Sequence, residues 1–210
     1  MGVPRLHLIT NDAVLRDAGF VDRADAVLAA LGPAAALHLR GHGLDGGVLF
    51  HLADRLRPSA SAAGAMLVVN DRVDVALAAG IRAVQLGRHA MPVQEVRRLL
   101  GEAARLGYSA HGAEEARAAV DAGADFVVIG TIYPTASHPG DPGAGPERVA
   151  RTAEMVRVPI IAIGGITPAR VAEVVEAGAH GVAVLGGVWH AADAAAAARN
   201  YLEALEEVST

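Results

Sequence analysis

The chain has 210 residues, of which 52% are hydrophobic, carries a formal net charge of −5 and contains no cysteine. This composition excludes disorder as the default, disulfides, thiol catalysis and cysteine-ligated zinc, and the net charge gives no general attraction to nucleic acid or to an acidic membrane surface. Lysine is absent too, which excludes Schiff-base catalysis, and since no segment has the pattern of a membrane span or a secretory signal, we expect a cytoplasmic protein.

Strand-like and helix-like segments alternate along the whole chain. Short apolar segments that end in a polar residue or glycine have the pattern of buried parallel strands, and they occupy residues 5–10, 35–40, 66–70, 83–86, 107–110, 126–130, 159–163 and 181–185. Helical spacing lies between them, for example at 71–79, 92–104, 113–122 and 169–177. Eight strands with helical crossovers predict an α/β protein with a single (β/α)8 TIM barrel, and a doubly wound open sheet is the alternative. Without a visible linker or second core, we expect one domain over 1–210.

Polar residues alternate with leucines along the second predicted strand. His38, Arg40 and His42 fall on one side, while Leu37 and Leu39 fall on the other. In a barrel, the leucines would pack on helices and the polar set would point into the interior. Because burying arginine and histidine is costly without a partner, we predict that the polar set binds substrate. A structural ion pair is the alternative.

The third predicted strand ends in Asn70 and Asp71, which suit a metal ion or a polar heterocycle. Asn and Asp are also preferred as helix N-caps, so we expect one of the two to cap the following helix. The other is then available for a functional role.

The fifth and sixth predicted strands are followed by hydroxyl groups and histidines. The candidates for acid–base catalysis are His111 and His138, because histidine titrates near neutrality. The glycine-rich stretch that begins near His138 predicts a lid over the site, with a plain mobile loop as the alternative. The histidines lack a metal-binding pattern on a helix, so we predict no zinc. The remaining candidates for substrate binding here are Ser109, Thr131, Thr135 and Ser137.

The last two predicted strands both end in a pair of glycines. Glycine lets backbone N–H groups approach a ligand closely, and the loops after strands 7 and 8 of a (β/α)8 barrel commonly bind phosphate. We therefore predict that a phosphate group is bound by the backbone of Gly165, Ile166, Gly186 and Gly187. The alternative is two tight turns without a ligand.

Taken in order, the motifs resemble the thiamine phosphate synthase/TenI family over nearly the whole chain. The motifs that carry the resemblance are Leu8-Ile9-Thr10-Asn11-Asp12, Leu37-His38-Leu39-Arg40, Val69-Asn70-Asp71-Arg72, Val84-Gln85-Leu86-Gly87, Ser109-Ala110-His111, Pro134-Thr135 and Ala162-Ile163-Gly164-Gly165-Ile166. The resemblance implies a (β/α)8 barrel, a homodimer, and a small phosphorylated heterocycle as substrate.

The synthase branch of that family joins an aminopyrimidine pyrophosphate to a thiazole phosphate and needs Mg2+. The resemblance places one magnesium ligand at Asp71 and a second carboxylate at the position of Ala90. It also places lysines where this chain has His42 and His138. One missing carboxylate and two missing lysines favour the other branch.

The TenI branch includes thiazole tautomerases, which move a proton and need no cofactor. We therefore expect a tautomerase in which Arg40 binds the substrate carboxylate and His138 or His111 moves the proton. The catalytic histidine of that branch falls at Thr131 here, which is a departure. Two alternatives stay open: a thiamine phosphate synthase with Mg2+ on Asp71, and a non-catalytic binder of a phosphorylated ligand.

Overall fold

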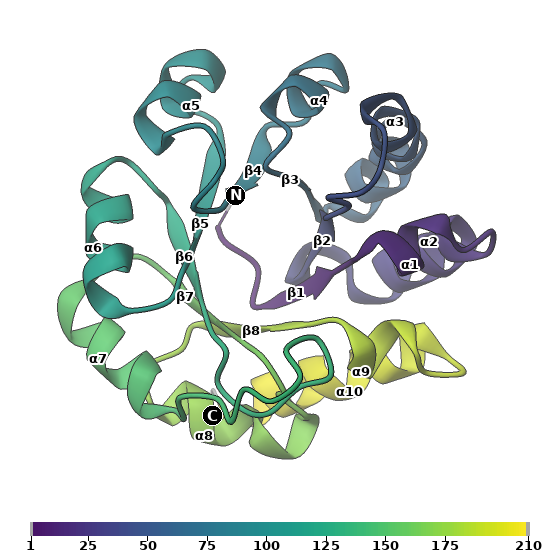
Figure 1. The fold of residues 1–210 in the computed structure, drawn as a ribbon. Coiled ribbons are helices and arrows are strands. Elements are labelled where there is room, and N and C mark those ends of the chain that lie inside the picture. Colours follow the sequence, from purple (N-terminus) through teal and green to yellow (C-terminus); the bar gives the residue numbers. More distant parts are fainter. Residues whose placement is uncertain (1, 209–210) are drawn as a thin grey trace.

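The strands form a closed parallel barrel in the order of the sequence (Figure 1), in a computed structural model that describes residues 2–208. Pairing of the first strand with the last closes the ring, with Leu6 opposite Val182. The predicted (β/α)8 barrel is confirmed and the open sheet is excluded. The strands are β1 Leu6–Ile9, β2 Ala35–Leu39, β3 Met66–Asn70, β4 Ala83–Leu86, β5 Arg105–Ala110, β6 Phe126–Ile129, β7 Ile160–Ile163 and β8 Gly181–Val184.

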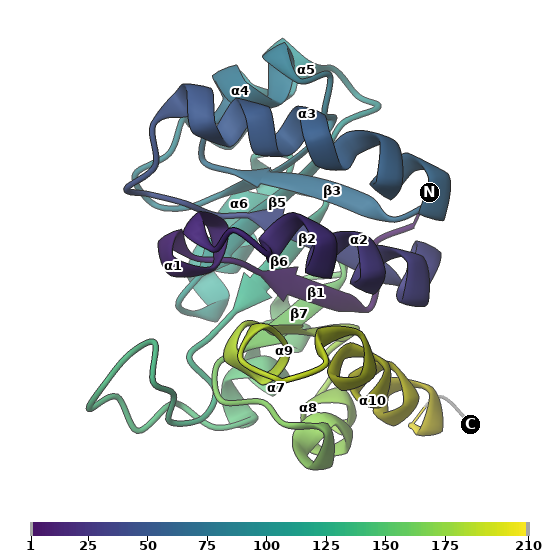
Figure 2. The same cartoon turned by 90° about the vertical axis from the view of Figure 1, so that its right-hand side faces the viewer.

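Helices surround the barrel, and the last helix packs beside the second to complete the outer layer (Figures 1 and 2). They are α1 Asp12–Arg16, α2 Phe20–Leu31, α3 Gly46–Ala63, α4 Val73–Ala78, α5 Val93–Leu100, α6 Ala113–Asp121, α7 Glu147–Met155, α8 Val171–Glu176, α9 Gly186–Trp189 and α10 Ala194–Glu207, with 3-10 turns at Gly32–Ala34 and Pro168–Arg170. Within residues 2–208, none of these helices combines the length and the apolar character that crossing a bilayer requires.

One predicted helix was too long. The stretch 92–104 is helical only to Leu100, because Gly101 has a φ of 75° and ends the helix. Strand β5 then starts at Arg105, two residues before the predicted start, since the Arg105 N–H donates to the Arg82 carbonyl at 2.8 Å.

Strand alternation separates two apolar regions. Leu37 and Leu39 belong to the large core between the barrel and its helices. Inside the barrel, one apolar cluster includes Phe126 and Ile161, and a second includes Val68. The interior therefore is filled by side chains, as expected for eight strands.

Two fully buried histidines lie inside the barrel and bond each other. His7 Nδ1 is 2.8 Å from His38 Nε2, His7 Nε2 is 3.0 Å from the Pro4 carbonyl oxygen, and His38 Nδ1 is 3.2 Å from Asn70 Oδ1. Burial lowers the pKa of His38 to about 4, and burial together with His38 lowers the pKa of His7. Both rings are therefore neutral at neutral pH.

We predict that the free energy of unfolding falls as the pH drops below the ordinary histidine pKa of 6.5. Between pH 6.5 and about 4, the unfolded chain takes up a proton that folded His38 does not. The stability is therefore full above that window and is lost within it, by roughly 3 kcal/mol for His38. Urea unfolding at about pH 7 and about pH 4.5 measures the loss.

The variant His38→Gln isolates this effect because glutamine keeps hydrogen-bonding groups but does not titrate. Carboxylates that titrate near the lower pH are present in both the wild-type protein and the variant, so their contribution cancels in the comparison. The loss of stability should be smaller in the variant, and an equal loss would contradict the prediction.

Candidate functional site

The predicted site residues lie near or just after the carboxyl ends of strands, so the closed parallel barrel brings them to one end. This is the end at which TIM-barrel enzymes carry their active sites. Strands β2, β3 and β5 contribute polar side chains, and the turns after β7 and β8 contribute glycine backbone. We call this region the carboxyl end of the barrel.

Asp71 has an unusual backbone conformation at this end. Its φ is 61°, the one positive φ of a non-glycine residue within residues 2–208. The backbone N–H of Asp71 donates to the Gln85 carbonyl at 2.8 Å, and its Oδ1 accepts from the Gly87 N–H at 2.9 Å. Oδ2 lies 3.7 Å from His42 Nδ1. Such a conformation costs about 1–2 kcal/mol and is typical of functional positions.

The expectation that Asn70 or Asp71 caps the next helix is wrong. Helix α4 has Arg72 at its N-cap position, without a side-chain hydrogen bond to the helix. The Asn70 amide bonds His38 and the Asp71 carboxylate bonds Gly87. Both partners lie on neighbouring strands or turns, and they leave neither side chain for the helix.

The residues predicted on strand β2 separate into two environments. His38 is fully buried and bonded on both ring nitrogens, so it lacks the exposure that direct contact with a substrate requires. The Arg40 N–H donates to Thr10 Oγ1 at 2.9 Å, whereas its guanidinium has no partner among the described residues. The alternative of a structural ion pair is therefore not realised for Arg40. A free guanidinium at this position suits an anionic ligand.

Strands β4 and β5 add a second polar group to the barrel interior. Gln85 is 2% exposed, and its Nε2 donates to Ser109 Oγ at 2.8 Å. The Gln85 Oε1 atom is buried without a hydrogen-bond partner among the described residues. Gln85 belongs to the motif Val84-Gln85-Leu86-Gly87 but was not among the predicted site residues, although its position makes it a candidate. One polar residue among the apolar residues of β4 was the signal that could have found it.

His111 contacts the first turn of helix α6. Its Nδ1 is 3.4 Å from Glu115 Oε2, and its backbone N–H donates to the same oxygen at 2.8 Å. The imidazole is 67% exposed and lines a hollow of about 580 Å³ with residues of α6 and α7, among them Arg151. The same carboxylate also accepts from Tyr108 Oη at 3.3 Å.

The loop between β6 and α7, residues 130–146, projects beyond the barrel (Figure 2). Its base is held to β7, since the Ile132 N–H donates to the Ile163 carbonyl at 3.0 Å and the Tyr133 N–H to the Gly164 carbonyl at 2.9 Å. At the tip of the loop, the Thr135 carbonyl oxygen accepts from the backbone N–H of His138 at 3.1 Å. The side chains of the predicted residues are partly exposed at Thr131 and Thr135 and exposed at Ser137 and His138.

Backbone N–H groups are available at both glycine pairs. The N–H groups of Gly165 and Ile166 donate to no protein group within residues 2–208. Gly186 and Gly187 begin the short helix α9, whose first N–H groups have no intrahelical partner. The two turns are tied together elsewhere, because Tyr201 Oη donates to the Ile166 carbonyl at 3.0 Å and packs against Gly187.

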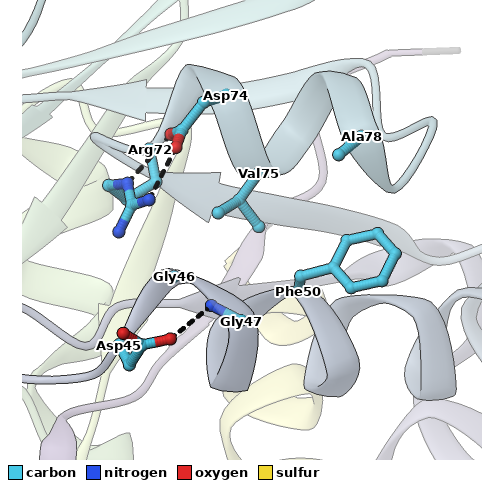
Figure 3. A pocket seen from close by; sticks show the side chains of 8 residues that line it. All are labelled: Asp45, Gly46, Gly47, Phe50, Arg72, Asp74, Val75 and Ala78. Carbon is cyan, nitrogen blue, oxygen red and sulfur yellow. Dashed lines mark hydrogen bonds and ion pairs between the residues drawn. The ribbon is translucent and has the colours of Figure 1, made fainter.

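A separate hollow of about 430 Å³ lies between α3 and α4 (Figure 3). Its charged groups already have partners. Arg72 donates to both oxygens of Asp74, at 2.9 and 2.6 Å, and Asp45 Oδ1 accepts from the Gly47 N–H at 2.7 Å. The Arg72 guanidinium is thus already neutralised by Asp74, and the hollow holds no free cation among its lining residues for a phosphorylated substrate, so the carboxyl end of the barrel stays the candidate site.

Comparison with known proteins places this geometry in a family context. The family model described as "Thiamine monophosphate synthase" matches residues 6–188. A thiamine-phosphate synthase of Methanoculleus marisnigri is 39% identical over 196 residues, which cover 93% of this chain and 92% of the relative.

Two further relatives agree. The thiamine biosynthesis bifunctional protein ThiM/ThiE of Symbiobacterium thermophilum is 49% identical over 153 residues, or 72% of this chain, which spans only 32% of that longer protein. The solved structure of thiamine phosphate pyrophosphorylase from Pyrococcus furiosus has a TM-score of 0.85 and 30% identity, covering 98% of this chain and 97% of that one.

These relatives overturn the tautomerase prediction. Curated relatives at 39–49% identity over most of this chain carry the name of the synthase or of a bifunctional protein in the same pathway. The histidine-based isomerase assigned from the missing lysines and carboxylate is therefore wrong, and the synthase alternative has the support.

We predict that Gly165→Ala destabilises the protein more than Gly80→Ala. Both glycines have a positive φ, 62° and 68°, so both substitutions carry a similar backbone cost of about 1–2 kcal/mol. An added Cβ at Gly165 would lie 2.4 Å from the Pro134 carbonyl oxygen. An added Cβ at Gly80 would have no heavy atom within 4 Å apart from those of its own chain neighbours. Urea unfolding should give an additional loss of about 1–3 kcal/mol for Gly165→Ala.

Limited proteolysis of the 130–146 loop provides a second readout. The clash forces the loop base to move, so cleavage within the loop should accelerate in Gly165→Ala but not in Gly80→Ala. Equal stability and equal cleavage in the two variants would contradict the close approach of the loop to Gly165.

Proposed function

The chain belongs to the thiamine monophosphate synthase family, whose model matches residues 6–188, and we propose that it is a thiamine-phosphate synthase. It joins an aminopyrimidine pyrophosphate to a thiazole phosphate and releases pyrophosphate. The observation that carries the proposal is that a carboxylate, Asp71, and the Arg40 guanidinium, which has no partner among the described residues, both lie at one end of the barrel. The homodimer implied by the resemblance and the cytoplasmic location expected from the sequence stay predictions.

The residues present fit a magnesium ion that is shared with the substrate. Mg2+ is commonly held by one or two carboxylates together with substrate phosphates and water. Asp71 supplies one carboxylate, whose Oδ2 accepts no N–H within residues 2–208, and Ala90 supplies none. No group of three or more metal-ligating side chains exists among the described residues, so the pyrophosphate would have to provide other ligands. When bound, Mg2+ would neutralise charge on the leaving pyrophosphate.

Cationic side chains of this chain would hold the same leaving group. Arg40 offers a guanidinium, which binds phosphate through paired N–H groups. His42 lies next to the Asp71 carboxylate, and His138 lies at the tip of the 130–146 loop. When protonated, these histidines add positive charge where the resemblance implies lysines.

The thiazole phosphate would occupy the opposite side of the same end. The free N–H groups of Gly165 and Ile166, with those at the start of α9, form a set of donors without a side-chain charge. The aminopyrimidine would then contact the polar groups of β3 to β5, namely Asn70 and Ser109, with Gln85 beside them. This arrangement places the two substrates side by side, which is the main requirement for the transfer.

We predict that purified protein forms thiamine phosphate from the two substrates in a Mg2+-dependent assay. Asp71→Asn should lower kcat/KM by about 100-fold, because it removes the charge that holds the metal and leaves the amide isosteric. Excess Mg2+ should recover part of the loss. The matched control is Asp74→Asn, whose carboxylate is 64% exposed and paired with Arg72 outside the candidate site.

Two results would contradict this assignment at different levels. Absence of thiamine phosphate at every Mg2+ concentration would overturn the proposed function. Full activity of Asp71→Asn would keep the function but remove the metal-binding role of Asp71.

A further inference from the structure

The buried histidines form a chain of hydrogen bonds with a fixed direction. A carbonyl oxygen only accepts, so the His7 Nε2 that lies 3.0 Å from the Pro4 oxygen carries a proton. In a neutral ring, His7 Nδ1 is then an acceptor. The His38 Nε2 atom at 2.8 Å must therefore donate to it, which leaves His38 Nδ1 as an acceptor.

Neutrality of both rings follows from their surroundings. Each ring is fully buried, and His7 packs against the ring of Phe126 with centroids 5.3 Å apart. Burial lowers the pKa of both imidazoles, so neither carries a second proton at neutral pH. Among residues 2–208, no carboxylate bonds either ring to stabilise a charge.

The last member of the chain must be a donor. His38 Nδ1 lies 3.2 Å from the Asn70 atom assigned as Oδ1, which would set two acceptors against each other. A half-turn of the amide group exchanges its nitrogen and oxygen without moving any other atom. Which of the two positions is nitrogen is therefore decided by the hydrogen bonds that each position makes. The Asn70 amide nitrogen therefore donates to His38, and its oxygen turns the other way.

We propose that His7 and His38 are positioning residues that hold the Asn70 amide with its oxygen toward the carboxyl end of the barrel, where it accepts a hydrogen bond from the substrate. Asn70 keeps 9% of its surface exposed, and no other described group bonds its second amide heteroatom. Gln85, its register partner on β4, has an Oε1 that is fully buried beside Gly107 and so is not presented to a ligand. The Asn70 oxygen therefore accepts one N–H bond of an amino group.

The identity of that amino group rests on the proposed function, since an aminopyrimidine carries one. The hydrogen-bond direction itself rests only on this chain. The chain of hydrogen bonds begins at the Pro4 carbonyl, in the N-terminal segment at the amino end of the barrel. The neighbouring Val3 carbonyl accepts from His180 Nε2 at 3.0 Å. One end of the barrel thereby sets what the other end recognises.

The first test reads the proton positions directly. Long-range 1H–15N spectra of the histidine rings distinguish protonated from unprotonated ring nitrogens. We expect Nε2 of both His7 and His38 to carry the proton at neutral pH. A proton on His38 Nδ1 in the wild-type protein would overturn the proposal.

The second test removes the start of the chain without touching Asn70. In His7→Leu, the His38 Nε2 proton loses its acceptor, so the proton moves to Nδ1 and the Asn70 amide turns its nitrogen toward the substrate. We expect the KM for the aminopyrimidine pyrophosphate to rise about tenfold, and the KM for the thiazole phosphate to change by less than about twofold. Equal changes in both KM values, or none, would overturn the proposal.

A pair of His38 variants and an unrelated buried substitution complete the design. His38→Gln keeps a donor for His7 and an acceptor for Asn70, so its KM should stay closer to the wild-type value than that of His38→Leu, for which we expect about a tenfold increase. Thr152→Val removes an equally buried hydroxyl from α7 and controls for general destabilisation. If His38→Gln and His38→Leu raise the KM equally, the proposal fails.

Binding of an aminopyrimidine alcohol, which is the substrate without its pyrophosphate, separates this inference from the proposed function. Calorimetry with wild-type protein and His7→Leu needs no turnover and should give an affinity about tenfold lower for the variant. If the wild-type protein binds the alcohol but forms no thiamine phosphate, the proposed function falls and the inference stands. If the two proteins bind the alcohol equally, the inference falls.

Discussion

Closure of the parallel barrel is the constraint on which the rest of the structure depends. Pairing of β1 with β8 satisfies both edges and leaves all eight strands pointing the same way. Every strand therefore delivers its last residue and the following turn to one end. Polar residues that are far apart in the chain, such as Arg40 and Asp71, gather there because the strands are parallel.

The chemistry is divided around that end. Strands β2 to β5 contribute side chains, including Arg40, Asn70 and Ser109, while the turns after β7 and β8 contribute backbone N–H groups at glycines. In a chain without lysine, the proposed synthase would use the neutral donor set for one phosphate, and arginine, histidine and one carboxylate for the pyrophosphate. Inside the barrel, His7, His38 and Asn70 lie between the apolar cluster of Phe126 and that of Val68. Their hydrogen bonds connect the amino end of the barrel to its carboxyl end.

The wrong choice of branch has a physical explanation. The tautomerase prediction counted each absent lysine and the absent carboxylate at Ala90 as lost function. A magnesium ion bound with a pyrophosphate takes much of its coordination from the substrate, so one carboxylate can suffice. Protonated histidines can also carry charge at the positions of lysines. Counting the missing residues one by one therefore left out what Asp71, His42 and His138 would provide together in the proposed synthase.

The sequence by itself determined the order of strands and helices, the barrel class and the family, because apolar alternation and terminal glycines are local signals. Only the tertiary structure decided that His38 is enclosed by His7, which lies 31 residues earlier, and that Asn70 turns to His38 rather than capping a helix. It also decided the left-handed conformation of Asp71 and the unpartnered oxygen of Gln85. These features depend on partners from other strands, and such pairings exist only once the barrel has closed.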